Sequence, residues 1–271
     1  MEHRDLGEPV AIGRTADIHK WGEGTVVKLY HDWFQFEWIQ GEATRSREVG
    51  KLDFPIPKVG EMVKVNGRNG LIFEHLDGQN MLANLKETPE RLPDFAKRLA
   101  KLHLDLHQVD EQLDLPTQHG KLEHNIRRAA PLSAEQKEKL VGLLHQMPKK
   151  SQVCHGDFHP GNIVVTANGE AIVDWNDCSM GNPIADVARS SILFLGGITG
   201  NEVPDPAFEK LVTECHDQYL AHYFAFSGVG EAGKDEYKRW LPIIAGARLA
   251  EGITTLEPWL LSEVEKINHM G

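Results

Sequence analysis

The chain has 271 residues, a formal net charge of −11 at pH 7 and 41% hydrophobic residues. This composition is typical of a packed globular protein, and a chain of this length can form two lobes around a cleft. The negative charge disfavours nucleic acids and anionic membranes as partners.

The sequence predicts neither a membrane-spanning segment nor a secretory signal. The sequence has no run of 18 apolar residues, so we expect no transmembrane helix. Its first five residues are polar or charged and no apolar region follows, which argues against a secretory signal. Cys154, Cys178 and Cys215 lack a paired spacing, which indicates free thiols in a reducing cytoplasm and no metal or disulfide role. No obligatory protein partner is implied.

The N-terminal part has the pattern of a β-rich unit. Strands are predicted over residues 8–13, 18–21 and 25–30, and a helix over residues 36–52 that ends before Pro55-Ile56-Pro57. Two further strands, over residues 59–65 and 71–73, are joined by Asn66-Gly67, a strong hairpin signal.

Beyond Gly78 the apolar spacing becomes helical. Leu or Phe recurs every three or four residues between positions 92 and 106. Further helices are predicted over residues 133–145, 183–195, 206–224, 234–254 and 258–268, and Ser133 with Gln136 can form a capping box. His103 and His107 are four residues apart, but no HExxH pattern accompanies them, which favours a packing or capping role over a metal site.

The sequence HGDFHPGN, residues 155–162, is the most informative motif. A short strand at residues 153–154 leads into it, and apolar runs at residues 163–166 and 171–174 predict a hairpin. The hairpin would bring Asn162, at the start of its first strand, close to Asp174, at the end of its second. Phosphoryl transfer needs such a set: Asp157 would accept the proton of a hydroxyl, and Asn162 and Asp174 would hold Mg²⁺.

This motif, together with Val173-Asp174-Trp175 and the sequence GNPIAD at residues 181–186, resembles the aminoglycoside phosphotransferase and choline kinase superfamily. The resemblance runs from about residue 9 to residue 195. It implies an α+β, two-lobed protein-kinase-like fold: an antiparallel sheet lobe (residues 1–75) and a larger, mainly helical lobe (residues 76–271). It also implies transfer of phosphate from ATP, with GTP possible, to a hydroxyl of a small molecule.

The resemblance extends to the nucleotide site. It implies that Lys28, on the third strand, contacts the phosphates, and that Glu42, or Glu48 as the alternative, holds this lysine. The loop before it keeps Gly13 of the usual glycine pattern, and Thr15 is small enough for backbone amides to approach a phosphate.

The hinge between the lobes would contain Glu74-His75-Leu76. Backbone groups from Glu74 to Leu76 would contact the purine edge. Because the hinge acts through its backbone, the sequence does not choose between ATP and GTP.

Other positions would support the catalytic loop or the acceptor. The resemblance implies that Asp186 braces the loop by hydrogen bonds, and His155 lies within the loop. His159 either contacts the γ-phosphate or supports the loop, and Asp177 would contact the acceptor or the metal shell. Further acceptor-site candidates on the C-terminal helices are Trp240, Arg248, Glu251, Glu257 and Trp259.

The acceptor itself is not fixed by the motif. From residue 177 onward there are 14 acidic against 7 basic residues, which suits either solvated helix faces or an acidic pocket for a cation. We expect an aminoglycoside-type antibiotic or a related cationic compound. The alternative is a metabolic kinase for choline, an amino alcohol or a sugar. A choline site would need an aromatic cage, for which the candidates are Trp175, Tyr219, Tyr223, Trp240 and Trp259.

Two other classes are disfavoured. A protein kinase would need a longer activation segment than the 11 residues between Asp174 and Asp186. A catalytically silent nucleotide-binding module would not be expected to keep all four key positions, which are Lys28, Asp157, Asn162 and Asp174.

Overall fold

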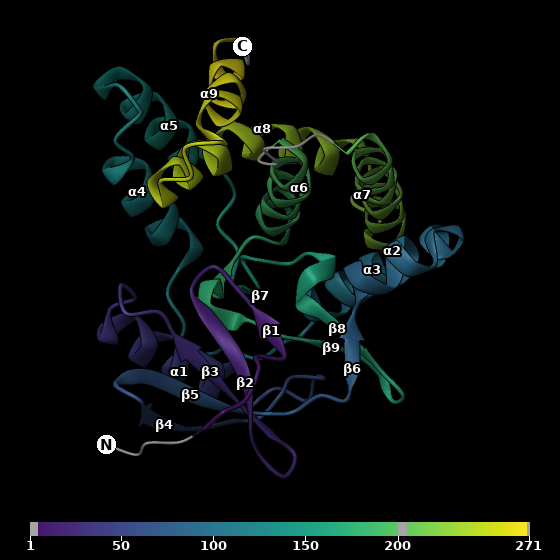
Figure 1. Cartoon of the computed structure of the whole chain (residues 1–271). Coiled ribbons are helices and arrows are strands. Elements are labelled where there is room, and N and C mark those ends of the chain that lie inside the picture. Colours follow the sequence, from purple (N-terminus) through teal and green to yellow (C-terminus); the bar gives the residue numbers. More distant parts are fainter. Residues whose placement is uncertain (1–4, 200–204, 270–271) are drawn as a thin grey trace. The chain divides into compact units, whose positions relative to one another are not determined.

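The computed structural model describes residues 5–199 and 205–269, which form two compact units (Figure 1). The first unit contains the described residues up to Asn80 together with Asn162–Asn176, and the second contains Met81–Gly161 and the described residues from Asp177 onward. The domain boundary predicted between residues 75 and 76 stays a prediction. The expectation about a secretory signal rests largely on residues 1–4, which lie outside the described residues. Within the described ranges, no helix has the length and apolarity needed to cross a bilayer.

A five-stranded antiparallel sheet, in the order β1-β2-β3-β5-β4, forms most of the first unit (Figure 1). Its strands are β1 (Ala11–Ile12), β2 (Ala16–Gly22), β3 (Thr25–Tyr30), β4 (Val59–Val65) and β5 (Arg68–Glu74). The β4–β5 hairpin turns at Asn66 and Gly67, whose φ angles of 49° and 86° suit the tight turn predicted there. The first strand is shorter than the predicted span of residues 8–13.

Helix α1 (Phe36–Val49) packs its apolar face on this sheet. Ile39 and Ala43 join Tyr30 and Leu71 in one buried cluster. The helix ends three residues before the predicted position 52, at Val49.

A second small sheet of the first unit carries the predicted hairpin. Its strands are β6 (Gly78–Asn80), β8 (Ile163–Thr166) and β9 (Gly169–Ile172), in the order β6-β8-β9. The strand predicted over residues 171–174 lies two residues earlier. Gly169 starts it with a φ of 120°, and Asp174 lies beyond its end with a φ of 64°, which a strand does not allow.

The second unit is mainly helical. Its α-helices are α2 (Met81–Glu87), α3 (Leu92–His107), α4 (Gln118–Arg128), α5 (Ala134–Gln146), α6 (Pro183–Thr199), α7 (Pro206–Ser227), α8 (Gly230–Arg248) and α9 (Glu257–Glu265). The capping box of α5 is present, with bonds of 3.2 and 2.9 Å between Ser133 and Gln136. One antiparallel pair is formed by β7 (Gln152–Cys154) and β10 (Ser179–Gly181), and β7 leads into the HGDFHPGN motif. Helices α2 and α4 were not predicted, and α4 has few apolar residues.

Candidate active site

Lys28 lies on β3 of the first unit and has two carboxylate partners there. Its Nζ is 2.7 Å from Oε1 of Glu42 and 3.0 Å from Oδ1 of Asp174. Burial alone would lower the pKa of Lys28, but Asp174 and Glu42 raise it above the ordinary lysine value. The first unit therefore holds a charged ammonium group in a fixed position.

Glu42, rather than Glu48, is the helix glutamate that meets this lysine. Glu42 is 1% exposed on the inner face of α1. The alternative, Glu48, forms an ion pair of 2.5 Å with the exposed Lys51. A buried, charge-assisted bond of the kind that Glu42 makes restricts the ammonium group far more than an exposed pair would.

Asn162 and Asp174 lie at the same end of the β8–β9 hairpin. The amide of Val173 donates to the carbonyl oxygen of Asn162 at 3.0 Å, just beyond the last strand pair. The side chain of Asp174 is 38% exposed, so its carboxylate is accessible as well as bonded to Lys28. Amide and carboxylate oxygens at adjacent positions are the donor types that Mg²⁺ prefers.

The remaining nucleotide-site predictions also fall in the first unit. Gly13 and Thr15 lie between β1 and β2, where the Gly13 amide closes a turn with a 2.9 Å hydrogen bond. Glu74 ends β5, its carboxylate accepts a bond of 3.1 Å from the amide of Lys58, and Leu76 follows half-buried. Contact of these residues with a nucleotide stays a prediction.

The turn that carries Asp157 follows β7 in the second unit. Gly156 has a φ of 78°, and a Cβ atom there would lie 2.4 Å from a backbone carbonyl oxygen, so the position requires glycine. The side chain of Asp157 is 26% exposed, with Oδ2 3.7 Å from Nε2 of His159. Burial alone would raise the pKa of Asp157, but His159, Arg189 and His155 lower it, so the carboxylate is ionised at neutral pH.

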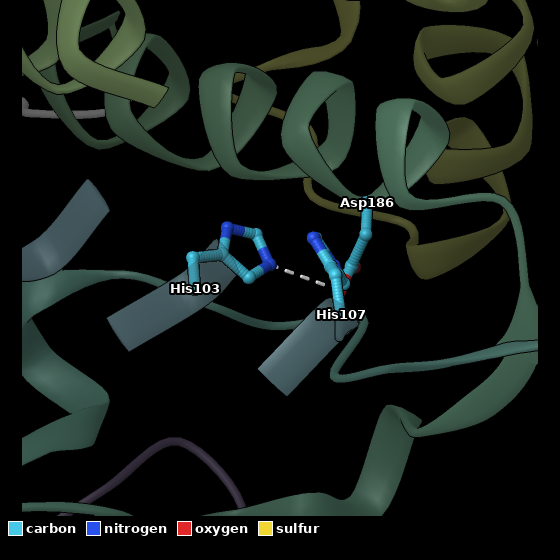
Figure 2. A group of neighbouring side chains, drawn as sticks. All are labelled: His103, His107 and Asp186. Atoms are coloured by element: carbon cyan, nitrogen blue, oxygen red, sulfur yellow. Dashed lines mark hydrogen bonds and ion pairs between the residues drawn. The ribbon is translucent and has the colours of Figure 1, made fainter. Parts of the chain in front are cut away.

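The carboxylate of Asp186, on α6, accepts hydrogen bonds from two backbone amides of this turn. Its Oδ2 accepts the amide of His155 at 2.7 Å, and its Oδ1 accepts the amide of Gly156 at 2.8 Å. Figure 2 shows that His103 and His107, from α3, approach the same carboxylate; their Nε2 atoms are 3.1 and 3.3 Å from Oδ2. These contacts are those expected of a residue that braces the catalytic loop.

Each of the two histidines also bonds a tyrosine. Nδ1 of His103 accepts from the hydroxyl of Tyr219 at 2.7 Å, and Nδ1 of His107 accepts from that of Tyr223 at 2.8 Å. Burial, together with the neighbouring His107, lowers the pKa of His103 to about 3, so its ring is neutral at pH 7. Both ring nitrogens of each histidine therefore have a protein partner.

Arg189 contacts the catalytic turn too, although the sequence did not single it out. Its Nε donates to the carbonyl oxygen of Gly156 at 3.0 Å, and its Nη2 is 2.7 Å from Oε1 of Glu251. Burial alone would lower the pKa of Arg189, but Glu251, Asp177 and Asp157 raise it. The sequence does offer one signal for Arg189, which lies three residues after Asp186 on the same face of the helix.

A pocket of the second unit opens beside the turn, with about 510 Å³ of empty space, part of it open to solvent. It is lined by Gln118, Lys121, Leu122, Asn125, Gly156, Asp177, Ser179, Ala185, Asp186, Arg189, Ile244, Ala247, Arg248 and Glu251. Of the predicted acceptor residues, Asp177, Arg248 and Glu251 are in this lining, whereas Glu257 and Trp259 are not. Lys121 was missed because α4 carries no motif.

Four of the five aromatic residues considered for a choline cage are used in packing. Trp175, Tyr219, Tyr223 and Trp240 are each at most 3% exposed, and both tyrosine hydroxyls bond the histidines. Among the residues that the structure describes, no aromatic side chain lines the pocket.

A family model described as the phosphotransferase enzyme family matches residues 11–228. The chain belongs to this family. It is a small-molecule phosphotransferase, as the catalytic motif predicted. Among curated proteins, none matches the sequence.

Solved structures of several small-molecule kinases share the fold. An aminoglycoside-3′-phosphotransferase of type VIII is 22% identical, with 88% of this chain and 91% of that chain covered and a TM-score of 0.60. A choline/ethanolamine kinase family protein from Mesorhizobium loti is 14% identical, with coverages of 96% and 84% and a TM-score of 0.59. An amicoumacin kinase in complex with AMP-PNP and Ca²⁺ is 14% identical, with coverages of 99% and 90% and a TM-score of 0.62.

The predicted fold class is therefore confirmed. The antiparallel sheet at the N-terminus and the mainly helical remainder match the kinase-like fold of these enzymes. The amicoumacin kinase structure contains a nucleotide analogue and a metal.

Proposed function

We propose that this phosphotransferase moves the γ-phosphoryl group of ATP to a hydroxyl of a small molecule. The observation that supports this most is the fixed ammonium group of Lys28, 2.7 Å from Glu42 and 3.0 Å from Asp174. A strand lysine held by a helix glutamate is the arrangement with which kinases contact nucleotide phosphates. GTP remains an alternative donor, because the hinge acts through its backbone.

Asp174 and Asn162 fit a Mg²⁺ site. Both offer oxygen atoms at one end of the hairpin, and the exposed part of the Asp174 carboxylate can coordinate a cation while its Oδ1 keeps the bond to Lys28. When bound, Mg²⁺ supplies charge neutralisation at the phosphate oxygens.

Asp157 would orient the acceptor hydroxyl and take its proton. His159, Arg189 and His155 keep the pKa of Asp157 low despite its burial, which makes it a weak base. This suits a loose transition state, in which positioning matters more than base strength. His159 accepts a bond of 3.1 Å from the amide of Gly161 through its Nδ1, which favours support of the loop over contact with the γ-phosphate.

The acceptor class has two candidates. An aminoglycoside-type antibiotic or related cation is supported by the fold similarity to an aminoglycoside-3′-phosphotransferase. A metabolic alcohol such as choline, an amino alcohol or a sugar is supported by a nearly equal similarity to the choline/ethanolamine kinase family protein. A coupled ADP-release screen across aminoglycosides, macrolides, choline, amino alcohols and sugars would distinguish them.

Two substitutions test the proposed chemistry. Asp157→Asn should lower kcat by about 100- to 10,000-fold and leave nucleotide affinity within a few-fold, because only the proton acceptor is removed. Asp174→Asn should remove the Mg²⁺ dependence of nucleotide binding. Asp110→Asn, which neutralises an exposed aspartate of the second unit, is the matched control and should keep wild-type activity. Equal turnover by wild type and Asp157→Asn would show that the protein does not transfer phosphate through this residue.

A further inference from the structure

Two tyrosines of α7 lie behind the catalytic turn, and the proposed chemistry gives them no role. Tyr219 and Tyr223 are four residues apart on α7, and each is at most 1% exposed. A buried hydroxyl group is costly unless it is hydrogen-bonded. The hydroxyl of Tyr219 is bonded to His103 and that of Tyr223 to His107, both on α3. The same contact between α7 and α3 therefore occurs twice, one helical turn apart.

The hydrogen bonds of His103 have one consistent direction. An ionised carboxylate accepts hydrogen bonds and cannot donate them, so the proton of the neutral ring lies on Nε2, 3.1 Å from Oδ2 of Asp186. Nδ1 of the ring is then an acceptor. Burial raises the pKa of Tyr219, so its hydroxyl keeps its proton and donates it to Nδ1 across 2.7 Å. The tyrosine thus stabilises the form and orientation of the ring that donate to Asp186.

Asp186 is the point at which both tyrosine–histidine pairs converge. The Nε2 atoms of His103 and His107 are 3.1 and 3.3 Å from its Oδ2 (Figure 2). The same carboxylate accepts the amides of His155 and Gly156, at 2.7 and 2.8 Å. Burial alone would raise the pKa of Asp186, but the two histidines lower it, so the carboxylate stays ionised. Its bonds to the backbone of the turn are therefore charge-assisted.

His103 also contacts the turn directly. Its ring stacks on that of Phe158, with the ring centroids 3.8 Å apart and an angle of 12° between the planes. Phe158 directly follows Asp157 in the chain and is fully buried. Because hydrogen bonds at two ring atoms fix the plane of the imidazole, the bond from Tyr219 also fixes the surface on which Phe158 packs.

We propose that Tyr219 and Tyr223 are positioning residues for phosphoryl transfer. Through the two histidines they keep the carboxylate of Asp186 bonded to the turn that carries Asp157. Their role rests on the proposed function, since it depends on Asp157 facing the acceptor hydroxyl. The residues that would hold the nucleotide phosphates and Mg²⁺ belong to the first unit. Loss of the tyrosine hydroxyls should therefore reduce turnover and leave nucleotide binding intact.

Tyr219→Phe and Tyr223→Phe each remove one hydroxyl and keep the aromatic ring. Turnover is measured as ADP release from MgATP, with water as the acceptor and then with kanamycin, choline or glucose added. Because a displacement of about 1 Å can lower a rate about 100-fold, each variant should lower kcat about fivefold or more, and the double variant about 50-fold or more. The KM for ATP should change by less than about twofold.

Tyr237→Phe is the matched control. Tyr237, on α8, also bonds α6 through its hydroxyl, but its partner is Oγ of Ser191, at 2.8 Å. Its loss removes a hydrogen bond of the same kind and should leave kcat unchanged. Urea unfolding of all the variants shows whether a lower kcat reflects only a lower stability.

Two measurements do not depend on turnover. In wild-type protein with ¹⁵N-labelled histidine, the ring of His103 should carry its proton on Nε2 and none on Nδ1 at pH 7, which the ring ¹⁵N chemical shifts report. His103→Gln identifies its signals. Hydrogen exchange at the amides of His155 and Gly156 should be about tenfold faster or more in the double variant, whereas the amides of α5 keep their wild-type rates.

The outcomes separate this role from the proposed function. Wild-type kcat in the double variant, in a protein that Asp157→Asn inactivates, overturns the role of the tyrosines while the kinase function stands. A loss confined to the KM for ATP overturns it as well. So does a proton on Nδ1 of His103 in the wild type, even where the variants do not fold.

Equal ADP release by wild type and Asp157→Asn contradicts the proposed function instead. Faster exchange at His155 and Gly156 in the double variant would then still show that the tyrosines hold the turn. Unchanged exchange at these amides would overturn both proposals.

Discussion

The buried hydrogen bonds of His103 behind the turn of Asp157 predict that the protein loses stability in acid. His103 is completely buried between Asp186 and Tyr219, and its ring stacks on Phe158 with a centroid distance of 3.8 Å. Because burial lowers the pKa of His103 to about 3, the folded chain keeps this ring neutral, whereas the unfolded chain protonates it near its ordinary value of 6.5. His103→Gln removes this difference.

The sign follows from the protons that each state binds. Below pH 6.5 the unfolded chain binds one more proton at His103 than the folded chain does. The free energy of unfolding therefore decreases by about 1.4 kcal/mol for each unit by which the pH is lowered. The stability that comes from keeping His103 neutral is fully present above pH 6.5, and it is lost progressively as the pH falls toward 3. At pH 7, His103→Gln should be less stable than wild type by about 1–3 kcal/mol, because a buried hydrogen-bond partner is lost. By pH 5, the gap should be smaller by about 2 kcal/mol.

Urea unfolding at several pH values, followed by tryptophan fluorescence and by circular dichroism, measures this gap directly. His124→Gln, which removes an exposed imidazole from α4, is the control and should follow the wild-type profile much more closely. Parallel pH profiles for wild type and His103→Gln would refute the reasoning, because they would show that His103 does not change its protonation on unfolding in this range.

Three further substitutions test the site. Lys28→Met should lower kcat/KM by about 100-fold or more because it removes a charge aimed at the phosphates, and steady-state kinetics that match wild type would rule this role out. Arg189→Gln should lower kcat and move the acid limb of the pH–rate profile to higher pH, since a cation that lowers the pKa of Asp157 is lost; an unmoved limb would count against it. Gly156→Ala should destabilise the chain by at least about 1–3 kcal/mol, because its φ is 78° and the added Cβ atom would lie 2.4 Å from a carbonyl oxygen; an unchanged unfolding midpoint in urea would contradict this.

The sequence was most informative where local rules act. The hairpin that places Asn162 beside Asp174 follows from alternation and turn chemistry, which depend on neighbouring residues alone. Its exact end was misplaced, since the left-handed backbone of Asp174 lies outside strand geometry and leaves no pattern in the side chains. The choice of Glu42 over Glu48 came from the family resemblance, judged by the distance of Glu42 from Pro55-Ile56-Pro57, and the structure pairs Glu42 with Lys28.

The network around Asp186 depends instead on residues far apart in the chain. Tyr219 lies 116 residues from His103, and Asp186 lies 83 residues from it. No periodicity links such positions, so the sequence suggested a packing role for the histidines without revealing their partners. Arg189 was missed for a related reason: its two contacts are a backbone carbonyl oxygen and Glu251, 62 residues further on.

Composition is less informative about the acceptor, for a different physical reason. The acidic surplus from residue 177 onward suits either solvated helix faces or an acidic pocket for a cation, because a count of charges carries no information about which side chains share a wall. Exposed acids interact with solvent and salt and contribute little field inside a pocket. Charged groups in the pocket wall, such as Arg248 at 8% exposure, interact at short range in poorly solvated surroundings. The few side chains that share the pocket wall therefore say more about the acceptor than a count of charges along the chain does.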